Sequence, residues 1–357
     1  MADLQDEPHS AGIGAEDLPA PAAPAAAVST LDRAAALLAV HPVLDGCNTL
    51  VWTLRQNPYL DIETSDAGVD TDIPRLRAGG VGAQFWSLLV PEGGSCGDGT
   101  TDQVVADTLE QIDVALALMR RHPDSLRLAL GADDLADARN RGRIASFLGP
   151  VPGRALTDSL GALRAFHALG VRSLAPAGAA WAREGLTAFG HEVVREANRL
   201  AVLLDLAGCP AAVARRIAAA SKAPVIVSGT GAAALNPHPD NVDDEVLAAL
   251  REANGLVMVS FDTARTGDSL HAVADHLDHV RAVAGPECVG LGAAFGTDRA
   301  GRHPTGLTDP SGYPRLIAEL LERGWTEPEL ALLTWANAQR VIRDTDFTAR
   351  RSSPTSA

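Results

Sequence analysis

Two thiols and one carboxylate stand at positions of this chain where a side chain could carry chemistry. Cys47 and Cys209 each follow an apolar run, and Asp262 follows the run 257–261. A cysteine thiolate is a nucleophile and a carboxylate can act as a general base, but a nucleophilic cysteine normally needs a histidine beside it. None of the ten histidines stands at a matching end of an apolar run. The simpler interpretation is that the two cysteines fill space and that Asp262 caps a helix.

A second group, Asp275, His276, Asp278 and His279, has side-chain atoms that could bind a metal ion. The apolar residues around this group recur at helical spacing from position 272 to position 283. The pattern therefore predicts an amphipathic helix, on which the group forms a charged and solvated face rather than a metal site.

The composition restricts the classes of partner. The chain has 357 residues, 46% of them hydrophobic, and a formal net charge of −15 at pH 7. Nucleic acid and anionic membrane surfaces are poor partners for such a negative protein. Four scattered cysteines without a CxxC pair indicate reduced thiols. We expect neither a secretory signal nor a membrane span, and the sequence predicts a cytoplasmic protein.

Strand-like and helical patterns alternate between two ends that lack both. Residues 1–28, rich in alanine and proline, are predicted as a disordered arm, and residues 349–357 as a flexible tail. Residues 29–348 form one predicted domain. Continuous apolar runs, typical of parallel strands covered on both faces, lie at 43–47, 82–90, 143–148, 171–176, 201–206, 224–228, 255–261 and 287–293.

Amphipathic helical patterns separate these runs, among them 102–121, 158–169, 190–200, 210–221, 243–253 and 269–284. Eight strands that alternate with helices predict an α/β fold, a (β/α)8 TIM barrel. No GxGxxG motif follows the first strand, which argues against the simplest dinucleotide-binding fold. The active face of such a barrel lies at the carboxyl ends of its strands, so the residues that follow each strand decide the function.

Dispersed motifs occur in one order along the chain: Leu44-Asp45-Gly46-x-Asn48, Thr71-Asp72-Ile73-Pro74, Gly82-Ala83-Gln84-Phe85-Trp86, His238-Pro239-x-Asn241 and Gly312-Tyr313-Pro314. On these motifs the chain resembles the membrane (renal) dipeptidase family of zinc peptidases. The resemblance runs from about Leu31 to Arg343 and implies a barrel of the metal-dependent hydrolase type. In an active member of the family it also implies two zinc ions at the barrel mouth.

The residues that the resemblance assigns to these zinc ions are all replaced. The family uses a His-x-Asp pair after the first strand, a bridging Glu after the third, a His after the fifth and the sixth, and an Asp after the eighth. We call the matching residues the ligand positions: Cys47, Thr49, Val151, Gly208, Gly229 and Ala294. The His and the Arg that contact the substrate match Gly178 and Asp240. Zinc needs several nitrogen, sulfur or oxygen ligands, so the sequence predicts that the metal is absent.

The sequence thus predicts a pseudoenzyme, a relative of the zinc dipeptidases that has lost their activity. It would bind a small molecule or peptide, or a protein partner such as a catalytic paralogue, and the resemblance implies a homodimer. Trp52, Cys209 and Asp262 are candidate pocket residues. Two alternatives stay open: a metal-independent enzyme that uses Cys47, Cys209 or Asp262, and a residual dipeptidase, as family membership suggests.

Overall fold

The computed structural model describes residues 29–64, 68–88, 101–296 and 302–352. The predicted arm, residues 1–28, lies outside the described residues. The strands are parallel throughout their paired stretches, and their bounds are β1 Val43–Asn48, β2 Val81–Trp86, β3 Leu126–Leu128, β4 Ile144–Leu148, β5 Val151–Pro152, β6 Ser173–Ala175, β7 Leu203–Leu204, β8 Ile226–Thr230, β9 Leu256–Val259 and β10 Val289–Leu291.

The strands form a seven-stranded sheet in the order β3-β4-β2-β1-β10-β9-β8 and a three-stranded sheet in the order β5-β6-β7. Two isolated parallel bridges, Leu148↔Val171 and Asp205↔Ile226, connect the sheets at both junctions. The strands β1, β2, β4, β6, β7, β8, β9 and β10 therefore follow one another around a ring, which is the predicted TIM-barrel arrangement. At its two junctions the ring is joined by single bridges rather than by ladders.

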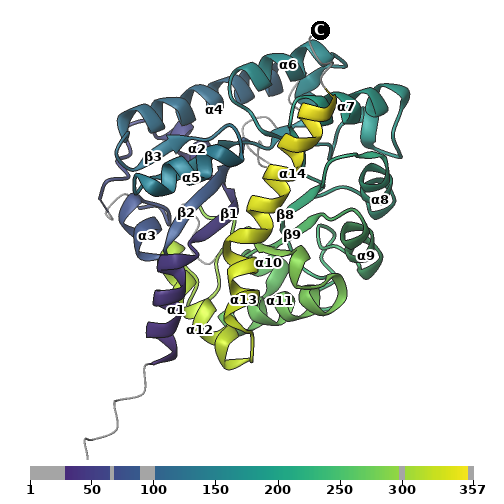
Figure 1. Ribbon diagram of the computed structural model, residues 1–357. Coiled ribbons are helices and arrows are strands. Elements are labelled where there is room, and N and C mark those ends of the chain that lie inside the picture. The colour runs from purple at the N-terminus through teal and green to yellow at the C-terminus, as the bar shows by residue number, and fades with distance from the viewer. Residues whose placement is uncertain (1–28, 65–67, 89–100, 297–301, 353–357) are drawn as a thin grey trace, which may run out of the picture.

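Helices surround this ring (Figure 1). Their bounds are α1 Thr30–Val40, α2 Leu50–Gln56, α3 Ile73–Ala78, α4 Thr101–Arg121, α5 Ala132–Asn140, α6 Leu160–Ala168, α7 Ala188–Arg199, α8 Ala211–Ala220, α9 Asp244–Glu252, α10 Thr263–Thr266, α11 Leu270–Ala284, α12 Tyr313–Glu322, α13 Glu327–Ala331 and α14 Asn337–Ser352. Neighbouring helices pack in chain order from α6 to α9 and then through α11 and α12 to α1, as the parallel topology requires.

Local sequence explains where several helices begin. The side chains of Ser29, Asp72, Thr187, Asp243 and Ser269 each accept a hydrogen bond from a backbone N–H in the first turn of the helix that follows. These contacts satisfy amide groups that a helix start otherwise leaves unpaired. The helices therefore begin at residues that the sequence marks as capping residues.

The barrel interior is filled by apolar side chains. Leu44, Leu203, Ile226 and Met258 belong to one buried cluster although their strands lie on different sides of the ring, so this cluster occupies the centre. Within the same cluster the rings of Phe85 and Phe147 stack with centroids 4.9 Å apart. The barrel is thus a packed core and not a pore.

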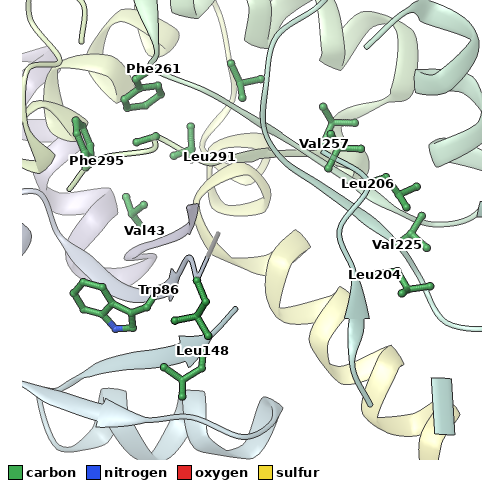
Figure 2. Packing of buried hydrophobic residues seen from close by; sticks show 14 of the residues in the cluster. Val43, Trp86, Leu148, Leu204, Leu206, Val225, Val257, Phe261, Leu291 and Phe295 are labelled. Carbon is green, nitrogen blue, oxygen red and sulfur yellow. The ribbon is translucent and has the colours of Figure 1, made fainter. Parts of the chain in front are cut away.

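A larger cluster packs the strands against the surrounding helices. Figure 2 shows members of this cluster from β1, β2, β4, β9 and β10, among them Val43, Trp86, Leu148, Val257 and Leu291. Each of these five side chains is almost completely buried. Interior and outer clusters together explain why the strands read as continuous apolar runs in the sequence.

The C-terminal helices close the amino-terminal end of the barrel. Thr334 donates a hydrogen bond to the carbonyl of His41 just before β1, and Asn337 donates to the carbonyl of Val289 at the start of β10. From there α14 crosses the barrel between α5 and α7, as the yellow helix in Figure 1 shows. The opposite end, where the strands finish, is the mouth.

The predicted strand runs all contain strands, and the structure adds elements that the patterns missed. These are the short strands β3 and β5 and the helices α2, α3, α5 and α10. In addition, α14 continues to Ser352, which corrects the predicted start of a flexible tail at Ala349; residues 353–357 lie outside the described residues. None of the helices in the described part of the chain combines the length and apolar character needed to cross a membrane.

Candidate functional site at the barrel mouth

The carboxylate of Asp45, on β1, holds three elements together at the mouth. One oxygen accepts hydrogen bonds from the amides of Cys47 and Ala293, at 3.1 and 3.0 Å, and the other accepts from the Tyr313 hydroxyl at 2.8 Å. Burial raises the pKa of Asp45 to about 6, although these hydrogen bonds act in the opposite direction. Asp45 is therefore a structural residue that joins β1 to the end of β10 and to α12.

Asp205 repeats this arrangement after β7. One of its oxygens accepts from the amides of Ala207 and Ser228, at 3.1 and 2.9 Å, and the other accepts from the Ser228 hydroxyl. Burial again raises the pKa, to about 6. The Asp205 carboxylate thus joins the end of β7 to β8, close to the bridge between the two sheets.

The first two ligand positions lie where β1 passes into α2. Cys47 is partly buried, and its carbonyl accepts a hydrogen bond from the amide of Ala294 at 3.0 Å. The Thr49 hydroxyl donates to the carbonyl of Phe295 at 3.1 Å, and its amide donates to the same carbonyl. The Thr49 hydroxyl therefore donates its proton to a backbone carbonyl.

The other ligand positions offer no side-chain donor atom. Val151 is fully buried on β5, where it pairs with β6. Gly208, Gly229 and Ala294 have left-handed backbones with φ of 72°, 67° and 62°. Glycine adopts this conformation without penalty, whereas alanine does so at a cost of roughly 1 kcal/mol. The left-handed backbone at these three strand ends therefore disfavours most residues other than glycine.

The two substrate positions differ in their surroundings. Gly178 is exposed, and a Cβ added there would meet open space. Asp240, in the loop after β8, forms an ion pair with Arg265 on α10, with 2.8 Å between Oδ2 and Nη2. The other terminal nitrogen of Arg265 donates to the carbonyl of Gly229. Arg265 is a mouth residue that sequence reasoning missed, since no motif surrounds it.

The position of Arg265 relates directly to the ligand positions. Its Nη1 atom lies 3.7 Å from where a Cβ of residue 229 would stand, and the Cβ of Cys47 lies 3.9 Å from that same point. A fixed guanidinium therefore occupies the space beside two ligand positions. Its positive charge faces the side of the mouth on which the resemblance places a metal.

The candidate thiols are protonated at neutral pH. Burial raises the pKa of Cys47 to about 12, and the negative charges of Asp45 and Asp205 act in the same direction. Burial likewise raises the pKa of Cys209 to about 12. Since the thiolate is the nucleophile, these pKa values argue against the alternative of a thiol-based enzyme.

The remaining candidate pocket residues make ordinary structural contacts. Asp262 caps α10 by accepting a hydrogen bond from the Ala264 amide at 3.0 Å, and it pairs with Arg302 at 3.1 Å. Trp52 lies on α2 with the Arg55 guanidinium 5.2 Å from its ring centroid. The capping predicted for Asp262 is thus observed, and its carboxylate has an arginine partner.

The group formed by Asp275, His276, Asp278 and His279 does not converge on one point. His276 is buried and accepts a hydrogen bond from the Ala232 amide, and burial lowers its pKa to about 4. Asp275 and Asp278 bind Arg323, while His279 binds Asp244. The group ties α11 to its neighbours, so the predicted solvated face is wrong for His276.

A dizinc centre needs several metal-binding side chains that converge on one place. Among the described residues, no group of three or more histidine, cysteine, aspartate or glutamate side chains is placed to hold a metal ion. Of the ligand positions, Cys47 offers one thiol and Thr49 is bound to a carbonyl, while the others have no donor atom. The described residues therefore do not fit the two-metal site that the resemblance implies.

The fold and the mouth define an α/β barrel of the hydrolase type. Its strand-end carboxylates, Asp45 and Asp205, accept hydrogen bonds from backbone amides and from hydroxyl groups. The chain matches the family model described as membrane dipeptidase, peptidase family M19, over residues 31–356. It belongs to this family.

Relatives and solved structures agree with this assignment. The chain is 39% identical over 345 residues to Dipeptidase 3 from Macaca fascicularis, covering 89% of this chain and 68% of the relative. It is 37% identical to Dipeptidase 3 from Homo sapiens, covering 92% and 71%. A metallo peptidase from Rhodobacter sphaeroides, liganded with a phosphinate mimic of the dipeptide L-Ala-D-Ala, is 26% identical with a TM-score of 0.77, covering 85% and 99%.

Proposed function

We propose that this member of the dipeptidase family is a binding protein that does not hydrolyse dipeptides through a dizinc centre. The observation that carries the proposal is the Arg265 guanidinium, which is fixed at the mouth by Gly229 and Asp240. A guanidinium and a zinc ion in adjacent positions repel each other, and the repulsion is strong where water is partly excluded. The ligand positions without donor atoms support the same conclusion.

The ligand in this proposal is a small molecule or a peptide that enters the mouth. The carboxylates of Asp45 and Asp205 would hold the walls of the mouth in place through the backbone, without touching the ligand. The homodimer and the catalytic paralogue as partner stay predictions from the sequence.

The proposal is tested on the purified full chain, first incubated with zinc sulfate and then freed of unbound metal. Zinc content is measured by mass spectrometry and hydrolysis of L-Ala-D-Ala by chromatography. The Rhodobacter sphaeroides metallo peptidase, which is liganded with a mimic of that dipeptide, serves as the positive control. We expect substoichiometric zinc and no hydrolysis above the buffer rate. Stoichiometric zinc together with turnover that a chelator abolishes would overturn the proposal.

A thermal-shift titration tests the binding half of the proposal. A ligand that binds the native state and not the unfolded chain raises the melting temperature. We expect L-Ala-D-Ala to raise it with the dipeptide recovered intact. A constant melting temperature up to saturating dipeptide would exclude dipeptides as the ligand class.

A further inference from the structure

The corner between helix α9 and strand β9 contains two neighbouring residues that can react with each other. Asn254 is the one asparagine of the sequence that is followed by a glycine, Gly255. Asparagine is thermolabile because a backbone nitrogen can attack its side-chain amide, and a glycine has no side chain to shield that nitrogen. Asn254 is exposed, whereas Gly255 is buried. The reactive amide thus lies at the surface, beside a nitrogen that the fold holds.

Local geometry requires this pair of residues. Asn254 has a left-handed backbone with φ of 50°, which asparagine adopts more readily than most residues do. A Cβ on residue 255 would lie 2.7 Å from the carbonyl oxygen of Val225, so any residue larger than glycine would collide with it. The fold therefore favours a reactive pair at the corner.

The same corner restrains the nitrogen that would react. The end of α9 forms a Schellman motif, in which the amide of Gly255 donates to the carbonyl of Leu250 at 2.8 Å. The amide of Asn254 donates to the carbonyl of Arg251 at 3.1 Å. From α14, Arg340 donates to the carbonyl of Asn254 at 2.7 Å and to that of Gly255 at 3.4 Å. The nitrogen of Gly255 can therefore attack only after the corner opens locally.

We propose that Asn254 is a deamidation site whose rate is set by the opening of the corner between α9 and β9. In the open form the amide nitrogen of Gly255 loses its proton and bonds to the side-chain carbonyl carbon of Asn254, and ammonia leaves. The cyclic imide that results takes up one water and opens to aspartate or to isoaspartate. One water is consumed and one ammonia released, so the reaction needs no oxidant or reductant. It does not depend on what the mouth binds.

The two products differ in their effect on the barrel. Aspartate keeps the backbone of the corner and adds one negative charge. Isoaspartate inserts an extra CH2 group into the main chain directly before Gly255, which is packed against Val225. The next amide, that of Leu256, donates to the Val225 carbonyl at 3.1 Å, where the pairing of β8 with β9 begins. The longer chain therefore disturbs this pairing and destabilises the barrel.

The test incubates the purified full chain at mildly alkaline pH and follows conversion of Asn254 by mass spectrometry of its peptides. A synthetic peptide of residues 247–260 gives the rate of the unrestrained pair. We expect the intact chain to convert at least about tenfold more slowly than the peptide, because the rate follows the population of the open form. A rate equal to that of the peptide would overturn the proposal.

Arg340→Gln removes the bonds to both carbonyls and should speed conversion roughly threefold or more. Hydrogen exchange of the Gly255 amide reports the opening directly and should rise by the same factor. Arg343→Gln, on the same helix and in contact with its neighbour Asp344, is the matched control and should change neither rate. Faster exchange in Arg340→Gln without faster conversion, or no conversion at all in that variant, would overturn the proposal.

Melting temperatures separate the two products. Chains that contain isoaspartate, isolated by chromatography after incubation, should melt below the unaltered chain. Asn254→Asp, which keeps the backbone, should melt close to it. Equal melting temperatures for the isoaspartate form and the unaltered chain would contradict the proposed effect on the pairing of β8 with β9.

Discussion

The mouth contains two buried carboxylates that are built alike and tied to different parts of the molecule. Asp45 and Asp205 each accept amide hydrogen bonds from the residue two positions later and from a residue across the gap to a neighbouring strand, and each accepts a hydroxyl. The hydroxyl at Asp45 comes from Tyr313 on α12, whereas the one at Asp205 comes from Ser228 on the adjacent strand. Asp45 therefore joins the barrel to the helix layer, and Asp205 joins strand to strand.

This pair also differs from the ligand positions beside it. Two of the ligand positions, Cys47 and Gly208, stand two and three residues after these aspartates. A buried carboxylate with three hydrogen bonds to the protein cannot be removed without leaving those donors unpaired. A side chain whose only partner is a metal ion leaves no protein donor unpaired when it is replaced. Asp45 and Asp205 are therefore more tightly constrained by the fold than Cys47 and Gly208.

Removing each carboxylate entirely should give the largest effect. Asp45→Ala and Asp205→Ala each leave several buried donors without a partner, and we expect each to lower the free energy of unfolding by about 3 kcal/mol. Urea denaturation measures the change. The half-exposed Asp240→Ala is the control and should lower the free energy by less than about 1 kcal/mol. If Asp205→Ala lowers the free energy of unfolding by no more than Asp240→Ala does, the two buried carboxylates do not stabilise the fold equally.

Replacing each carboxylate by its amide should reveal their titration. The folded-state pKa of about 6 lies above 3.8, the ordinary value of an aspartate, for both residues. The native state therefore binds more protons between these values, so this contribution to stability is fully present below about pH 4 and is lost as the pH rises through about 6.

As the pH rises from about 4 to above 6, the free energy of unfolding of the unaltered chain should fall relative to that of Asp45→Asn or Asp205→Asn. The fall should be at most about 3 kcal/mol per group. Melting temperatures measured from pH 4 to pH 7 as differences between variant and unaltered chain isolate the effect from other carboxylates. A difference that is constant with pH would show that the carboxylate concerned titrates normally.

Removing the hydroxyls should give the smallest effect and separate the two roles. Tyr313→Phe and Ser228→Ala each delete one hydrogen bond, for an expected loss of about 1 kcal/mol. Only Tyr313→Phe should speed amide hydrogen exchange in α12, because only Tyr313 connects the carboxylate to that helix. Faster exchange in α12 caused by Ser228→Ala would contradict the distinction.

Much of the fold could be predicted because its main strands correspond to continuous apolar runs in the sequence. Runs such as 143–148 and 255–261 are continuous and apolar, and they contain β4 and β9. The strand β3 was not predicted because it has only three residues with Arg127 at its centre. The helix α5 was not predicted because its sequence is mostly polar. Short or polar elements depend on tertiary contacts that a local pattern does not record.

The site was predictable only in part, for a related reason. The ligand positions follow from the order of motifs along the chain, whereas the contacts that organise the mouth join distant residues. Tyr313 reaches Asp45 across 268 positions, and Arg265 reaches Gly229 across 36. No spacing rule connects such residues, so the guanidinium at the mouth became visible only in three dimensions.

The backbone at Gly208 and Gly229 disfavours a histidine ligand at either position. A histidine restored at either position would have to take a left-handed backbone, which costs an L-residue roughly 1 kcal/mol or more. At position 229 it would also meet the Arg265 guanidinium. Because zinc binds only when several ligands are present together, no single substitution to histidine would gain the stabilisation that a bound metal provides. A zinc site at this mouth would therefore require several substitutions together.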